Sequence, residues 1–312
     1  MNLRRRFPIL AAAVMLVLAV GCEHEGTAPE LVLKNWREMV RDVHALKAET
    51  SQDGLPGIII GIADDISGSA GSTNIRRITL GDLEPAIKRI QRTGGEIAVA
   101  TISSRPDEGL LRLRVQPPPI LPPTLQGFDE TTPTKKTLAC LLVLDSLIYT
   151  DINTCNKKGP KGTTSRDEAL HVRELFKTLP SDIAQSRENY KQWQDATKKA
   201  LDEFNPLAKT LLTRPIEGNT DLCTPLNRLA LFVKEPSVWL AESAVIRALI
   251  LSTDGEETVR PGCPLPQLPN DTDFYLINCA TPCALDPLKP HKYEAFTAAL
   301  QAVVISKKVS TR

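Results

Sequence analysis

Three short stretches of the chain consist almost entirely of apolar residues, many of them β-branched. They are "GIIIGIA" at 57–63, "EIAVATI" at 96–102 and "AVIRALIL" at 244–251. A continuous apolar run of this length is typical of a strand buried on both faces, as in a parallel sheet. Helical patterns at 80–93 and 225–235 separate these runs. Strands that alternate with helices predict an α/β fold, with a doubly wound, mostly parallel sheet and helices on both faces.

The remaining elements are predicted from local patterns. "LLRLRVQ" at 110–116 alternates apolar and charged residues, which favours an edge strand. "DFYLINCA" at 273–280 is expected to be the final strand, and "HKYEAFTAALQAVV" at 291–304 the final helix. Asp82 is the expected N-cap of the helix at 80–93. Two further helices are expected at 166–179 and 181–212, with Ser181 capping the second and Pro206 kinking or ending it.

The domain organisation follows from these elements. Residues 1–21 are expected to be a signal peptide, and 22–54 a tether with an amphipathic helix. That helix is indicated by apolar residues spaced alternately four and three apart: Val32, Trp36, Met39, Val43 and Leu46. Residues 55–312 form the α/β domain, with an insertion at about 117–185 that lacks clear periodicity.

The N-terminal segment indicates export. Three arginines precede an apolar run from Ile9 to Val20, followed by Gly21 and Cys22. "LAVGC" resembles the lipobox of bacterial lipoproteins, although Ala19 stands where leucine is commonest. The resemblance implies acylation of Cys22 and a lipid anchor in the cell envelope. Glu23 differs from the aspartate that retains some lipoproteins at the inner membrane, which favours the outer membrane. A plain secretory signal and an uncleaved anchor are the alternatives.

Six of the seven cysteines follow Cys22, and an even number in an exported chain favours disulfides. Cys140 with Cys155 and Cys279 with Cys283 are the favoured local pairs. Buried free thiols are the alternative.

The charge balance excludes some partners. Lysines and arginines number 38 and aspartates and glutamates 37, so there is no basic excess to attract nucleic acid. The adjacent Asp64 and Asp65 could suggest acid–base catalysis, but neighbouring carboxylates in one loop are expected to be solvated or capping.

Three polar clusters lie where ligands bind in such sheets, beyond the carboxyl ends of strands. "DISGS" at 65–69 and "TDG" at 253–255 follow apolar runs, and "GNTD" at 218–221 precedes a helix. Together they offer carboxylate and hydroxyl oxygens, the donors that Mg²⁺ and similar hard cations prefer.

These clusters make the chain from about Leu55 onward similar to a von Willebrand factor A domain. That family carries a metal-ion-dependent adhesion site, made of D-x-S-x-S, a distant threonine and a distant aspartate. The long insertion and Ala70, where the family often has methionine, depart from the pattern. The resemblance implies metal ligation at five positions: Asp65, Ser67, Ser69, Thr220 and Asp254.

The expected function is therefore cation-dependent binding of a protein or other anionic partner, without catalysis. The expected cation is Mg²⁺, with Mn²⁺ and Ca²⁺ as alternatives. A metal-free structural scaffold of the envelope is the first alternative function, and a hydrolase the second.

Overall fold

The computed structural model describes residues 28–50, 55–68, 76–103, 109–128, 131–146, 155–156, 164–218, 220–235, 245–255, 264–279 and 283–306. The predicted signal peptide, Cys22 and Ser69 lie outside these ranges. No helix within these ranges combines the length and the apolar character that a membrane span requires. The chain divides into two compact units, residues 51–119 with 189–312 and residues 1–50 with 120–188.

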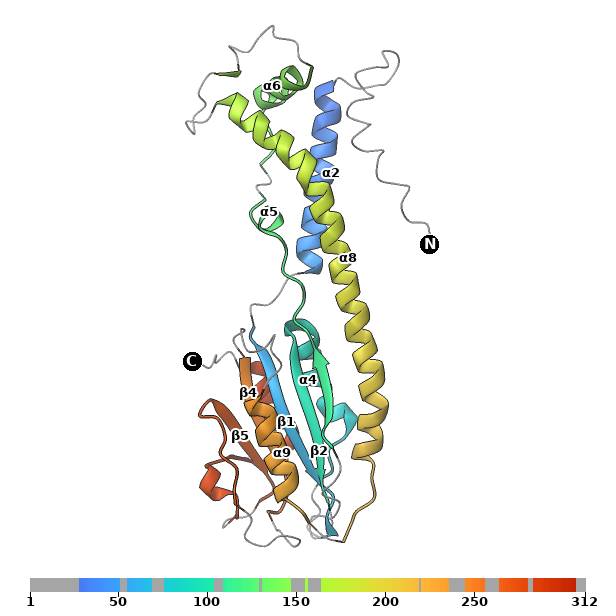
Figure 1. Ribbon diagram of the computed structural model, residues 1–312, viewed down its shortest axis with the longest axis vertical. Coiled ribbons are helices and arrows are strands. Elements are labelled where there is room, and N and C mark those ends of the chain that lie inside the picture. The colour runs from blue at the N-terminus through green and yellow to red at the C-terminus, as the bar shows by residue number, and fades with distance from the viewer. Residues whose placement is uncertain are drawn as a thin grey trace. The chain divides into compact units, whose positions relative to one another are not determined.

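The first of these units is built on a six-stranded sheet of order β3-β2-β1-β4-β5-β6 (Figure 1). All neighbouring strands are parallel except β2 and β3, which are antiparallel. The unit is therefore α/β with a mostly parallel sheet, as predicted. The strands are β1 (Gly57–Asp65), β2 (Gly95–Ile102), β3 (Leu111–Val115), β4 (Val245–Ser252), β5 (Thr272–Ile277) and β6 (His291–Tyr293).

All residues of β1 are buried, which explains its apolar sequence from Gly57 to Ala63. Its side chains alternate between two hydrophobic clusters. Ile58, Ile60 and Ile62 join a cluster that includes α4 (Leu80–Thr93), α11 (Phe296–Ile305) and the last turns of α8 (Ser165–Leu212). Ile59 and Ala63 join a second cluster that includes α9 (Cys223–Lys234).

The sequence predicts two separate helices at 166–179 and 181–212, but the structure has one helix, α8. It runs without interruption from Ser165 to Leu212, through Pro180 and Pro206. The Ser181 hydroxyl is no cap and donates to the Thr178 carbonyl oxygen within the helix, at 2.7 Å. An internal proline removes one backbone hydrogen bond. Here buried side chains on both sides of each proline hold the helix in place: Leu179, Ile183, Phe204 and Ala208.

Two smaller predictions are also wrong. The cap of α4 is Thr79, whose hydroxyl accepts from the Asp82 backbone N–H, while the Asp82 carboxylate accepts from the Thr79 N–H at 2.9 Å. Asp82 is thus the third helical residue of a capping box. At the C-terminus, the segment His291–Tyr293 is a sixth strand that pairs with β5, after a short 3-10 helix η2 (Asp286–Leu288), so α11 begins only at Phe296.

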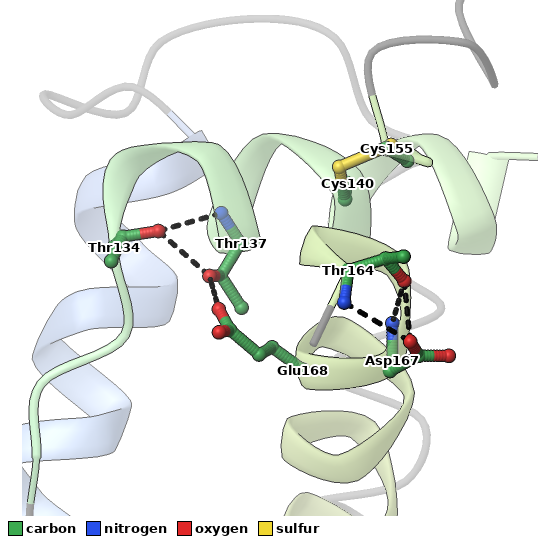
Figure 2. Close-up of a disulfide and its surroundings, with 7 residues drawn as sticks. All are labelled: Thr134, Thr137, Cys140, Cys155, Thr164, Asp167 and Glu168. Carbon is green, nitrogen blue, oxygen red and sulfur yellow. Dashed lines mark hydrogen bonds between the residues drawn. A yellow bond between two sulfur atoms is a disulfide. The ribbon is translucent and has the colours of Figure 1, made fainter. Parts of the chain in front are cut away.

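The second unit is helical where it is described. It contains α2 (Ala28–Glu49), α5 (Pro123–Gln126), α6 (Lys135–Ser146) and the first turns of α8. The amphipathic helix α2 forms as predicted and buries Trp36, Val43 and Leu46. Figure 2 shows the Cys140–Cys155 disulfide and, apart from it, the Thr137 hydroxyl, which donates to Glu168 of α8 at 2.7 Å.

Substitution of Gly95, at the start of β2, tests the close contact between β1 and β2. Its φ is +154°, and a Cβ would lie 2.4 Å from the Ile58 carbonyl oxygen on the neighbouring strand. Because that neighbour is backbone, we expect Gly95→Ala to lower the free energy of unfolding by about 1–3 kcal/mol. Gly109→Ala is the matched control, since no atom of the described residues lies within 4 Å of its Cβ position. Urea unfolding of both variants measures the difference, and equal stabilities would contradict this account of the β1–β2 contact.

Candidate functional site

The candidate site lies at the carboxyl ends of β1 and β4. β1 is the first strand of the chain, with β2 on one side and β4 on the other, so the strand order reverses between β1 and β4. The connection after β1 runs through α4, and the connection before β4 runs through α9, which pack in different hydrophobic clusters. Such a reversal is where open α/β sheets bind ligands.

Asp65 and Thr253 face one another at this point. In the parallel register Ala63 lies beside Leu251 and Asp64 beside Ser252. Asp65 and Thr253 are therefore the next pair of residues along the two strands. Their side chains lie on the same side of the sheet, and the Thr253 hydroxyl donates to Asp65 Oδ2 at 2.7 Å. The Gly255 backbone N–H donates in turn to the Thr253 oxygen at 3.0 Å.

The Asp65 side chain is 1% exposed and is surrounded by hydrogen-bond donors. Its Oδ1 accepts from the Ser67 backbone N–H at 2.8 Å. Burial raises the pKa of the Asp65 carboxyl, hydrogen bonds from Ser67 and Thr253 lower it, and the negative charge of Asp254 raises it further. The site therefore places buried Asp65 and partly exposed Asp254 close enough for their carboxylates to repel each other.

Thr220 lies on a segment that is bonded to the same edge of the sheet. The Glu217 backbone N–H donates to the Ile66 carbonyl at 2.7 Å, and the Asp221 N–H donates to the Ser103 carbonyl at 3.1 Å. Thr220 itself is buried. The segment is thereby fixed beside the residues that follow β1 and β2.

Of the five residues proposed as ligands, four lie in the described ranges and all four lie at this edge. Asp65, Ser67 and Asp254 are linked by hydrogen bonds and electrostatic proximity, and Thr220 lies on the adjoining segment. The fifth, Ser69, lies outside the described residues. Within the described ranges, no group of three or more histidine, cysteine, aspartate or glutamate side chains could hold a metal ion. The oxygen donors here are instead two carboxylates with hydroxyl groups.

The expectation that the adjacent carboxylates of Asp64 and Asp65 are solvated or capping is wrong for Asp64. Asp64 is fully buried, and Arg77 Nε donates to its Oδ2 at 2.6 Å. Arg77 also donates to the carbonyl oxygens of Leu212 and Arg214 at the end of α8, at 3.0 and 3.1 Å. Burial raises the pKa of Asp64 to about 6, although the charge and hydrogen bond of Arg77 lower it. Asp64 is thus a structural residue that ties β1 to α8.

Sequence reasoning missed Arg77 and did not assign Thr253 a role. No periodic signal in the sequence links Arg77 to Asp64, because the partner is chosen by tertiary packing. Thr253 could have been found, since it follows an apolar strand directly and precedes Asp254-Gly255.

Both local cysteine pairs named from the sequence are bonded in the structure, Cys140 with Cys155 and Cys279 with Cys283. Cys223 is disulfide-bonded as well. Of these, the Cys279–Cys283 bond lies next to the candidate site, with Cys279 Sγ 3.1 Å from the Asp254 carbonyl oxygen.

Comparison of the chain with protein-family models, with curated proteins and with solved structures found no match. The site must therefore be interpreted from its own residues and from the sequence pattern.

Substitution of Thr253 tests the hydrogen bonds that its hydroxyl makes within the candidate site. Thr253→Val removes a donor to buried Asp65 and an acceptor for the Gly255 N–H, so we expect a loss of about 1–3 kcal/mol in the free energy of unfolding without metal. Thr272→Val is the matched control, because the buried Thr272 hydroxyl has no hydrogen-bond partner in the described part of the chain. Denaturant unfolding with chelator present distinguishes the variants, and a similar stability for both would contradict the role given to Thr253.

Proposed function

We propose that this chain is an envelope-anchored binding module of the von Willebrand factor A type. The carboxyl ends of β1 and β4 bind a divalent cation, Mg²⁺ in the first place, with Mn²⁺ or Ca²⁺ as alternatives. Through that cation the module recognises an acidic group of a protein or other anionic partner, and it performs no catalysis. Acylated Cys22 anchors it in the bacterial outer membrane.

One observation carries this proposal: buried Asp65 lies between the Ser67 N–H and the Thr253 hydroxyl, within electrostatic reach of Asp254. The two carboxylates repel each other, and a divalent cation between them would offset that repulsion. Carboxylate and hydroxyl oxygens are the donors that hard cations prefer. The donor set therefore fits a cation such as Mg²⁺.

The arrangement of the sheet supports the same proposal. The order β3-β2-β1-β4-β5-β6 is the order of the dinucleotide-binding doubly wound folds, which bind ligands at the reversal point. Helices contribute to both hydrophobic clusters, α4 and α11 to one and α9 to the other. We therefore propose that the sheet is doubly wound.

The roles of individual residues are those that the sequence resemblance implies. Ser67, Ser69 and Thr220 would hold the cation by their hydroxyl groups, and Asp65 and Asp254 would act mainly through water. Neutral hydroxyl ligands leave the cation with positive charge to offer to an acidic partner. Recognition of a partner would then depend on both the cation and the partner's carboxylate.

Metal addition tests the proposed site directly. Mg²⁺ at about 100 times its dissociation constant should raise the free energy of unfolding by about 2.7 kcal/mol, because it binds only the native state. Asp65→Asn should abolish this increment. Isothermal titration of Mg²⁺ and Mn²⁺ into the purified protein gives the affinity, and thermal unfolding gives the increment.

Asp273→Asn is the matched control for this titration. Asp273 is an aspartate near the start of β5 and pairs with Ala248 in the middle of β4, so it lies away from the carboxyl ends of the strands. Its substitution should leave the metal increment unchanged. Absence of binding at millimolar metal, or equal binding by wild type and Asp65→Asn, would support the metal-free scaffold instead.

The lipid anchor has a separate test. Cys22→Ala should remove the acyl chains, so that the protein leaves the membrane fraction or retains its signal peptide, as fractionation and intact mass would report. Glu23→Gln is the control and should remain membrane-attached. Unchanged attachment and unchanged mass of Cys22→Ala would show that the protein is not a lipoprotein.

A further inference from the structure

The Cys279–Cys283 disulfide packs directly against the loop that follows β4. Gly255, the residue after Asp254, has a φ of +83°, and a Cβ on it would lie 2.4 Å from Cys279 Sγ and 3.0 Å from Cys283 Sγ. Cys279 Sγ also lies 3.1 Å from the Asp254 carbonyl oxygen. The loop therefore rests on the two sulfur atoms with no space for a side chain between them.

Both ends of this contact are fixed by hydrogen bonds. The Thr253 backbone N–H donates to the Ile277 carbonyl at 3.1 Å, which joins the loop to the end of β5. The Cys283 N–H donates to Asp286 Oδ2 at 3.0 Å, and the other oxygen of Asp286 pairs with Lys292 of β6 at 2.8 Å. Both sulfur atoms belong to the same buried cluster as α9.

A continuous path of contacts leads from the disulfide to Asp65. The sulfur atoms contact Gly255, the Gly255 N–H donates to the Thr253 hydroxyl, and that hydroxyl donates to Asp65. Asp254 lies between the two contact points on the same loop. Two sulfur atoms that are not bonded must lie well over 1 Å further apart than bonded ones, because they then meet at van der Waals distance. Without the covalent bond, the sulfur atoms and Gly255 cannot keep their present positions.

We propose that the Cys279–Cys283 disulfide is a positioning element of the cation site, which holds Asp254 and Thr253 in the arrangement that binds metal. This inference rests on the proposed cation-binding function. It adds that cation affinity depends on the disulfide, so that the site is complete only in the oxidised protein. An exported chain meets this condition after it has left the reducing cytoplasm.

The test compares two pairs of cysteine substitutions in the purified protein. Cys279→Ser/Cys283→Ser should weaken Mg²⁺ binding about 10- to 100-fold, the usual effect of removing an outer-shell support of a metal site. Cys140→Ser/Cys155→Ser removes a disulfide of the other compact unit and should leave the affinity unchanged. Titrations are made well below the unfolding temperature of each variant, so that a loss of stability alone does not change the measured dissociation constant.

If Cys279→Ser/Cys283→Ser does not fold, Gly255→Ala with the disulfide intact provides the second measurement. Its Cβ would be forced against Cys279 Sγ, and Mg²⁺ binding should weaken in a protein whose disulfides are all formed. Wild-type affinity in the folded cysteine variant, or in Gly255→Ala, would overturn the inference and leave the cation site standing. Absence of Mg²⁺ binding by the wild type would instead overturn the proposed function itself.

Discussion

The parallel pairing of β1 with β4 is the constraint on which the rest of the site depends. These strands lie at the centre of the sheet and are buried on both faces, so their register is fixed by packing along their whole length. A slip of one residue would move Asp65 to the other face and separate it from Thr253. The hydrophobic core thus positions the polar residues at the carboxyl ends of the two strands.

The same alternation gives the two neighbouring aspartates different roles. Asp64 points toward the cluster of α4 and α8, where Arg77 neutralises it and also bonds to the carbonyl groups at the end of α8. Asp65 points the other way, where its donors include the backbone and side chain of Ser67 and the neutral Thr253 hydroxyl. A carboxylate with a guanidinium partner is satisfied within the fold. One that faces neutral donors and a second carboxylate is suited to a cation.

Much of the sheet could be predicted from the sequence, because unbroken apolar runs and one alternating run encode burial directly. The continuous helix α8 could not be predicted. Local sequence rules include the helix-breaking effect of Pro180 and Pro206 but not the tertiary packing around them. Strand β6 is three residues long and exposed, so no hydrophobic pattern marks it. At the site, the resemblance to the family motif pointed to Asp65, Ser67, Thr220 and Asp254, whereas the Asp64–Arg77 pair depends on a tertiary contact without a local signal.

The position of Gly255 shows how the covalent and electrostatic parts of the site are joined. A glycine with positive φ lets the backbone turn directly after Asp254, and the lack of a Cβ lets the disulfide approach. The turn presents the Gly255 N–H to Thr253, and the disulfide limits the movement of the loop on its other side. An aspartate loop that could relax would separate Asp254 from Asp65 and relieve their repulsion without a cation. A loop held by the disulfide keeps the two carboxylates together, so that their repulsion persists until Asp65 is protonated or a cation binds between them.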